Sequence, residues 1–214
     1  MIALVDYGAG NLTSVRKALN ALGAEFVVPS SPADIPDARA LIVPGVGHFA
    51  ATSRLRGAWT DAIGASVRRG TPLLGICVGM QWLFEGSEEA PDVPGLGVFP
   101  GRIARLAGDP AQRLKVPHVG WNALEIRGPA RLLDGLHSGS QVYFTHSYAA
   151  PVTPDCVAAT THANTFSSVV ERDNVFGVQF HPEKSGEAGL RILRNFLALA
   201  GSTLVDAEVA RHRC

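Results

Sequence analysis

One of the three cysteines lies in a pattern that activates a nucleophile. Gly75-Ile76-Cys77-Val78-Gly79 follows an apolar run, where a predicted strand meets a predicted helix. Glycines two positions before and two after Cys77 allow a sharp turn that exposes the side chain at the carboxyl edge of a sheet, as in the G-x-S-x-G elbow. The positive end of the following helix lowers the pKa of such a thiol, and the thiolate is the attacking species. The pattern therefore predicts a nucleophile at Cys77.

A histidine and an acid supply the base that such a thiolate needs. Residues 176–180 form a predicted strand, and His181-Pro182-Glu183 follows at its end. Because the proline should keep the chain extended, we expect side chains 181 and 183 to project the same way. His181 would then face Cys77, and Glu183 would accept the other ring N–H, as in a Ser-His-Asp triad.

Acyl transfer also needs two donors for the oxyanion. The backbone N–H of Val78, directly after the nucleophile, is the first candidate. Pro44-Gly45-Val46-Gly47 directly follows the predicted strand 40–43, and its glycines let the peptide adopt or flip into a donor-inward geometry. We therefore expect the second donor to be the N–H of Val46 or Gly47.

The elements that must position these residues follow from hydrophobic periodicity. The first half alternates β-branched runs with amphipathic stretches, which is typical of βαβ units. It predicts strands at 2–5, 26–28, 40–43 and 73–76, and helices around 15–22 and 59–67. A Gly- and Pro-rich loop is expected at 86–101, followed by strands at 119–126, 141–145, 157–161, 167–170 and 175–180 and a helix at about 187–200. This order predicts a three-layer α/β fold, with a mainly parallel central sheet flanked by helices and a strand-rich second half.

Composition excludes several functions. The 214 residues suffice for one domain with its own core, which we expect over residues 1–200, with a frayed tail over 201–214. Nineteen Lys and Arg balance nineteen Asp and Glu, which argues against binding to nucleic acid. The most apolar stretch, residues 71–84, is shorter than the ~20 residues of a membrane span. Three cysteines without a CxxC pair, and no signal peptide, favour a reducing cytoplasm.

The sequence does not match the common cofactor and metal motifs. Gly8-Ala9-Gly10 lacks the small residue that a dinucleotide loop needs at position 13, and no acid ends the second predicted strand. No lysine lies in a phosphate loop, and the histidines show no HExxH spacing. We expect no cofactor and no metal.

At these residues the chain resembles the class I glutamine amidotransferases, in which a thiol triad hydrolyses glutamine through a glutamyl thioester and delivers ammonia to a synthase. The resemblance covers residues 1 to about 200. Within the family it is strongest to the glutaminase subunits of imidazole glycerol phosphate synthase. The segments that carry it are 6–12, 44–47, 75–81, 117–122, 143–148 and 179–185. The triad segments are common to the family, whereas 6–12, 117–122 and 143–148 select this subunit.

The resemblance also assigns roles. It implies that Cys77 is the nucleophile, His181 the general base and acid, and Glu183 its orienter. It places L-glutamine against Gln81, Gly47, Ser147 and Tyr148, and a partner against Asn11, His118, Trp121 and Lys184.

The implied partner is a (β/α)8 barrel cyclase, bound as a heterodimer. It would use the ammonia to make imidazole glycerol phosphate and aminoimidazole carboxamide ribotide in histidine biosynthesis. Because ammonia released into water becomes ammonium, a dry route between the two sites is needed. We expect glutaminase activity to be low alone and to rise with the cyclase and its nucleotide.

Three alternatives remain open. A glutaminase of pyridoxal phosphate, anthranilate or GMP synthesis would share the triad but not segment 117–122. A stand-alone cysteine peptidase or hydrolase would turn over without a partner. A flavodoxin-like binding module would not depend on Cys77.

Overall fold

The computed structural model describes residues 1–9, 12–111 and 113–201, and its largest sheet has eight strands. In spatial order these are β2 (Phe26–Val27), β1 (Ile2–Leu4), β3 (Ala40–Gly45), β4 (Leu73–Cys77), β14 (Val175–Val178), β13 (Asn164–Arg172), β12 (Cys156–His162) and β9 (Glu125–Ile126). Pairs from β2 to β14 are parallel, and pairs from β14 to β9 are antiparallel. The predicted parallel half is therefore followed by an antiparallel half.

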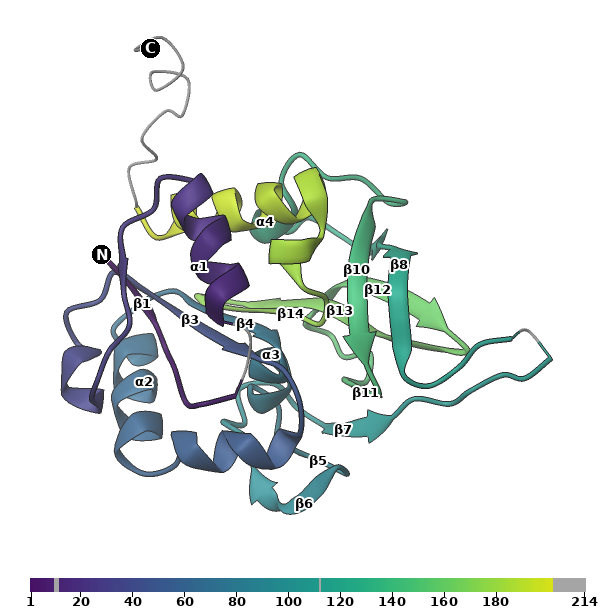
Figure 1. Ribbon diagram of the computed structural model, residues 1–214, viewed down its shortest axis with the longest axis horizontal. Helices are drawn as coiled ribbons and strands as arrows, with labels where there is room; N and C mark the ends of the chain where they lie inside the picture. The colour runs from purple at the N-terminus through teal and green to yellow at the C-terminus, as the bar shows by residue number, and fades with distance from the viewer. Residues whose placement is uncertain (10–11, 112, 202–214) are drawn as a thin grey trace, which may run out of the picture.

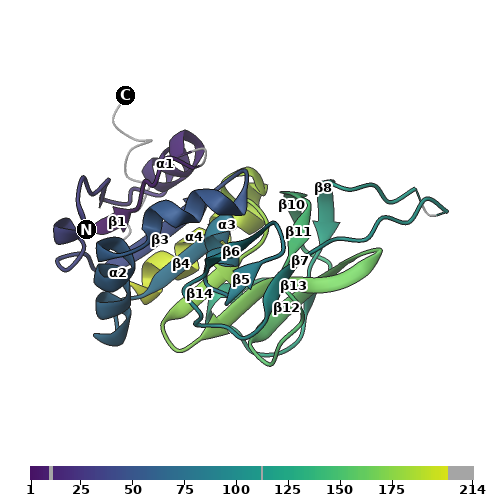
Figure 2. The ribbon, with the colours of Figure 1, turned by 90° about the horizontal axis from the view of Figure 1, so that it is seen from below.

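Helices cover both faces of this sheet (Figures 1 and 2). The helices α1 (Leu12–Ala21) and α4 (Gly186–Leu199) lie on one face, and α2 (Ala58–Arg68) and the short α3 (Val78–Trp82) lie on the other. Alternation along β1 produces the two layers of core: Ile2 and Leu4 pack with residues of α1 and α4, whereas Ala3 packs with residues of α2 and α3. The predicted three-layer α/β fold is confirmed. Among the described helices, none has the length and apolar character to cross a membrane.

Two smaller sheets correct the sequence prediction. The strand β8 (His118–Ala123) pairs with β10 (Gln141–His146), and β11 (Tyr148–Ala149), β7 (Arg102–Arg105), β5 (Gly86–Ser87) and β6 (Ala90–Pro94) form the other sheet. The prediction of a loop throughout 86–101 is wrong, because β5 pairs with the distant β7 and its short strands carry no periodic signal. The predicted strand 119–126 divides at the buried Leu124 between two sheets.

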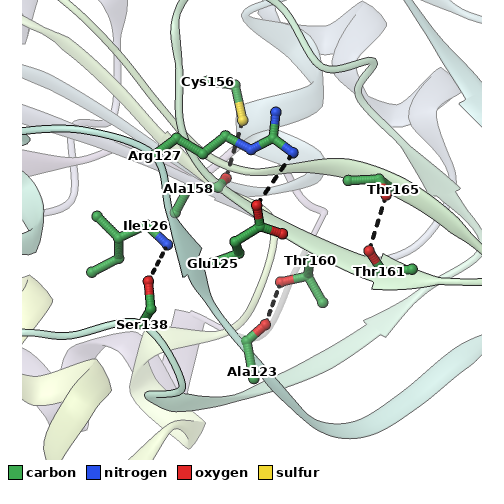
Figure 3. A network of polar contacts seen from close by, with 10 residues as sticks. All are labelled: Ala123, Glu125, Ile126, Arg127, Ser138, Cys156, Ala158, Thr160, Thr161 and Thr165. Carbon is green, nitrogen blue, oxygen red and sulfur yellow. Dashed lines mark hydrogen bonds and ion pairs between the residues drawn. The ribbon is translucent and has the colours of Figure 1, made fainter.

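Cys156 belongs to the antiparallel edge of the large sheet (Figure 3). Its Sγ donates to the carbonyl of Ala158 at 3.2 Å, and burial raises the pKa of its thiol. Nearby, Thr160 Oγ1 donates to the carbonyl of Ala123 at 2.9 Å, which ties β12 to the end of β8. Cys156 therefore has a local structural role. Cys214 and most of the predicted tail lie outside the described residues.

The two glycines around Cys77 are required by close packing. A Cβ on Gly79 would overlap the carbonyl oxygen of Val43 in β3. A Cβ on Gly75 would lie 2.6 Å from the carbonyl oxygen of Gly79. Because the obstructing atoms are backbone, they cannot move aside as the end of a flexible side chain can. The first turn of α3 therefore lies directly against β3 and β4.

This packing predicts opposite effects for the same substitution in two helices. Gly79→Ala should lower the free energy of unfolding by about 1–3 kcal/mol through overpacking. Gly64→Ala in α2 should raise it by about 0.5–1 kcal/mol, because its Cβ meets only the end of the Arg68 side chain at 3.3 Å. Urea denaturation of both variants measures the difference. Equal changes in the two variants would contradict the packing argument.

Candidate active site

Three adjacent parallel strands end together at one edge of the large sheet. Gly45, at the end of β3, pairs with Cys77 at the end of β4, and Val178, at the end of β14, pairs with Ile76. The residues that follow these strand ends therefore lie close together. In open α/β sheets, ligands bind at this carboxyl edge.

Cys77 turns sharply between β4 and α3. Its backbone has φ 54° and ψ −110°, a strained conformation for a residue with a Cβ, and the residue is 3% exposed. The helix after it has only five residues, so few peptide dipoles align toward the sulfur. Gln179 makes a direct polar contact with the sulfur of Cys77, because its Nε2 donates to Sγ at 3.7 Å.

His181 and Glu183 form a buried pair. His181 Nδ1 lies 2.8 Å from Glu183 Oε1, and both side chains are 1% exposed. The expectation of an extended chain between them is wrong, because Pro182–Lys184 forms a 3-10 turn (η4). The His181 backbone is held on both sides: its N–H donates to the carbonyl of Tyr143 at 2.9 Å, and its carbonyl accepts from Ser185 Oγ at 2.7 Å.

The electrostatics of this pair favour a charged ring. Burial alone would lower the pKa of His181, but Cys77 and Glu183 outweigh it and raise that pKa to about 10. Its Nε2 is buried without a hydrogen-bond partner among the described residues. At neutral pH the arrangement therefore favours an imidazolium at His181, with one N–H available for transfer.

A cavity of about 230 Å³ opens over Cys77. It is smaller than the ~300–1,000 Å³ of pockets for drug-sized ligands, so it suits a molecule the size of an amino acid. Its walls include the predicted oxyanion and substrate residues Val46, Gly47, Val78, Gln81, Ser147 and Tyr148. A larger hollow, of about 740 Å³, lies away from Cys77 between η3 (Arg131–Leu133) and α4, and Arg131 and Glu171 in its wall are ion-paired with each other at 2.6 Å.

The loop expected to carry the second oxyanion donor has room to move. Val46 is 38% exposed, and no atom lies within 4 Å of a Cβ built on Gly47, whose φ is 107°. Gly45, by contrast, is packed: a Cβ there would lie 2.9 Å from the Cβ of Val78. The loop is therefore fixed at its base and open at its tip.

Gln81 is held inside the protein by its amide group. Its Nε2 donates to the carbonyl of Tyr148 at 2.9 Å and to Gln179 Oε1 at 3.1 Å. These two bonds use both of its N–H groups. Only the amide oxygen of Gln81 is left for a ligand in the cavity.

The sequence analysis missed Glu89, Gln179 and Tyr7. Glu89 lines the cavity and accepts from the N–H of Phe49 at 2.7 Å, but in the sequence it was one acid among several in a predicted loop. Gln179 directly precedes Phe180 and His181, yet an amide at a strand end carries no distinct signal. Tyr7 is 6% exposed, and its hydroxyl has no partner among the described side chains; burial, and then the charge of Cys77, raise its pKa.

The four residues predicted to contact a partner lie in different environments. Trp121 is 56% exposed, and Lys184 is exposed with its Nζ 5.9 Å from the centre of the Tyr143 ring. Asn11 lies outside the described residues. The prediction of a surface position for His118 is wrong, since this residue is only 4% exposed. Side chains alternate along β8, so His118 points inward while Val119 and Trp121 point outward.

Comparisons with known proteins agree with this geometry. The family model for glutamine amidotransferase class-I matches residues 3–200. The imidazole glycerol phosphate synthase subunit HisH of Deinococcus radiodurans is 48% identical over 91% of this chain and 92% of its own length. The same subunit of Thermococcus kodakarensis is 47% identical over 93% of this chain and 100% of its own.

The fold is also found in solved structures. A crystallised glutamine amidotransferase superimposes with a TM-score of 0.73, at 24% identity, over 94% of this chain and 100% of its own. At that identity the likeness shows the fold alone. The family model and the HisH relatives extend over nearly the whole chain, so the protein belongs to the class I glutamine amidotransferase family and, within it, groups with the HisH subunits.

Proposed function

We propose that this chain is the glutaminase subunit of an imidazole glycerol phosphate synthase, which hydrolyses L-glutamine and passes the ammonia to a cyclase. One observation carries the proposal: at the carboxyl edge of the sheet, Cys77 lines a cavity of amino-acid size and interacts with His181, whose other ring nitrogen is paired with Glu183. The HisH relatives, at 47–48% identity, support the choice of this synthase among those that use a glutaminase.

In the first half of the reaction, the Cys77 thiolate attacks the side-chain carboxamide carbon of glutamine. The carbonyl oxygen becomes an oxyanion, which the N–H of Val78 and an N–H from the tip of the 44–47 loop stabilise. When the C–N bond breaks, the His181 imidazolium gives its proton to the departing nitrogen, which leaves as ammonia. A glutamyl thioester on Cys77 and a neutral His181 remain.

In the second half, the neutral ring of His181 takes a proton from water as the water oxygen attacks the thioester. The C–S bond then breaks, glutamate leaves, and the thiolate–imidazolium pair is restored. Glu183 stabilises the ring whenever it is charged and keeps Nε2 directed toward the reacting atoms, as the acid of a triad does.

The cavity also matches the charges of glutamine. Glu89 places a carboxylate in the wall, where it can accept hydrogen bonds from the substrate's α-ammonium group. The amide oxygen of Gln81 adds a second acceptor, and Ser147 and Tyr148, whose carbonyl accepts from Gln81, line the same cavity. Because glutamine has no net charge, these local groups suffice without a charged surface. No cofactor or metal takes part in the steps derived for these residues.

We assign the partner's docking surface to a patch formed by the exposed Trp121 and Lys184 and the half-buried Tyr143. The rings of Trp121 and Tyr143 lie 6.0 Å apart at 72°, and Lys184 lies over Tyr143. The patch is next to the site, because His181 bonds to the backbone of Tyr143 and Lys184 follows Glu183. Exposed aromatic side chains beside a cation are typical anchors of an interface. The partner proposed is a (β/α)8 cyclase, bound as a heterodimer.

Cytoplasmic location and one catalytic domain complete the proposal. Cys77 and Cys156 are unpaired, and a thiol nucleophile needs a reducing compartment to stay active. The elements from β1 to α4, which end at Leu199, supply every site residue named for catalysis, so residues 1–200 form one glutamine amidotransferase domain.

Cys77→Ala should lower the rate of glutamate release about 10⁴-fold or more, because no other group in the cavity can form the thioester. Coupled measurement of glutamate, with the cyclase present, checks this. Cys156→Ala is the matched control and should keep wild-type kinetics, since Cys156 does not line the cavity. Retained turnover in Cys77→Ala would contradict the mechanism and favour a binding role.

Glu183→Gln should lower kcat about 10³- to 10⁴-fold and shift the alkaline limit of activity. The imidazolium that protonates the leaving nitrogen is lost as pH rises through the pKa of His181, which is about 10. Without the carboxylate one cause of the raised pKa disappears, so the alkaline limb of the pH profile should move to lower pH. A profile of kcat/KM for both proteins checks the direction; an unchanged limb would show that Glu183 does not support the charged ring.

The same patch predicts the behaviour of the free chain and the complex. Glutamate release should be slow for the chain alone and should rise when the cyclase and its nucleotide substrate are added. Trp121→Ala should weaken binding to the cyclase by about 2 kcal/mol or more, measured by calorimetry. Val28→Ala, which shortens an apolar side chain that is 37% exposed beside β2, is the control and should bind normally. Equal rates with and without the cyclase would favour a stand-alone hydrolase.

A further inference from the structure

Three histidines that the mechanism does not use are buried together beside the cavity, and His146 is part of its wall. His118, His146 and His162 are 4%, 6% and 9% exposed and come from β8, β10 and β12. His118 stacks on His162 with ring centres 4.1 Å apart, and its Nδ1 lies 3.0 Å from Nε2 of His146. Among the described residues, no group of His, Cys, Asp or Glu side chains is arranged to hold a metal ion. The cluster therefore needs another explanation.

The hydrogen bonds determine which ring nitrogen carries the proton in His118 and in His146. Asn122 Oδ1 accepts from the N–H of Ala123 at 2.8 Å, so its Nδ2 is the group that faces His118 Nε2 at 3.4 Å. His118 Nε2 must then accept, and its Nδ1–H donates to His146 Nε2. At the other end, His146 Nδ1 lies 2.9 Å from the carbonyl of Tyr148, which can only accept. Both ends thus require the Nδ1–H form of both rings.

Burial keeps the two rings neutral, as this arrangement requires. Burial, followed by the neighbouring histidines His146 and His162, lowers the pKa of His118 to about 3. Burial also lowers the pKa of His146 to about 4, although its bond to Tyr148 acts in the opposite direction. Neither ring therefore carries a charge at neutral pH, and each has one donor and one acceptor.

The chain of bonds ends at the nucleophile. The carbonyl of Tyr148 accepts from His146 on one side and from Gln81 on the other, at 2.9 Å each. Gln81 also donates to Gln179 Oε1, and Gln179 Nε2 donates to the sulfur of Cys77. A continuous series of hydrogen-bonded groups thus runs from the partly exposed Asn122, next to the exposed Trp121, through buried side chains to Cys77.

We propose that His118 and His146 are positioning residues that hold the carbonyl of Tyr148 in place, and with it the glutamine-binding wall and the Gln81–Gln179 amide pair beside Cys77. The proposal deepens the proposed function and rests on it. A purely structural cluster would not need rings with polar atoms: a buried imidazole is costly unless both nitrogens are bonded, and phenylalanine would fill the same volume.

Variants of His146 separate positioning from packing. His146→Phe keeps a ring but removes the donor to Tyr148, and the KM for glutamine should rise about 5-fold or more, with a smaller change in kcat. His146→Asn places an N–H near the position of Nδ1, and its KM should return toward the wild-type value. His118→Phe leaves His146 Nε2 without its donor and should also raise KM. All are measured in the complex with the cyclase, together with the melting temperature.

The control is His162→Gln, which keeps a donor for the carbonyl of Lys115 but removes the ring stacked on His118. It should leave kcat and KM within about 2-fold of wild type. Positioning is overturned if the Phe variants keep the wild-type KM, or if His146→Phe and His146→Asn raise it equally.

A second measurement does not depend on activity. Nitrogen-15 NMR of the wild-type chain should show both His118 and His146 in the neutral Nδ1–H form, and a proton on Nε2 of either ring would overturn the chain of bonds. If the wild type releases no more glutamate than Cys77→Ala, the proposed function is wrong. If the wild type is active and the histidine variants have its KM, only the positioning proposal is wrong.

Discussion

The left-handed backbone of Cys77 is the constraint on which the rest of the site depends. A residue with a Cβ in such a conformation costs about 1–3 kcal/mol, and it persists only where its surroundings fix it. Here β4 is paired on both sides, by β3 and β14, and Gly79 packs against the backbone of Val43. Because these contacts leave no room for a relaxed turn, the sulfur stays at the sheet edge. There it lies next to the residues that follow the neighbouring strands β3 and β14.

One buried histidine near the cavity is charged and two others are neutral, and the balance between burial and neighbouring groups explains both. Burial opposes protonation in all of them. Around His181 two neighbours, Cys77 and Glu183, outweigh burial and favour the imidazolium. Around His146 the ring nitrogens meet a carbonyl and another imidazole, so burial prevails and the ring stays neutral. The charged ring can transfer a proton during the reaction, whereas the neutral rings can only orient what they touch.

The parts that could be predicted from the sequence are those with a local signal. The parallel strands are continuous apolar runs, and the elbow is five adjacent residues, so both were found. The short strands β5 and β6 were not, because their pairing depends on β7 and not on their own residues. Glu89, in the turn between β5 and β6, gains its place only because β6 packs against η2 (Phe49–Leu55). The inward direction of His118 had no such signal, because large apolar residues at 119 and 121 predict that these two face the core and that His118 faces solvent, the reverse of what the structure shows.

The walls of the cavity differ in how firmly they are held, and this difference decides where a partner can act. Hydrogen bonds connect Gln81 to Tyr148 directly and to Cys77 through Gln179. Val46, by contrast, is exposed, and Gly47 has open space around it. The tip of the 44–47 loop is therefore the wall that can change without breaking the others. Moving a two-state loop from 1% to 99% of one form needs about 5.5 kcal/mol of differential binding. Three interface anchors at about 2 kcal/mol each would supply that amount, provided that they bind only one form of the loop. A docked partner can thus control the oxyanion donor while the nucleophile and its base stay fixed.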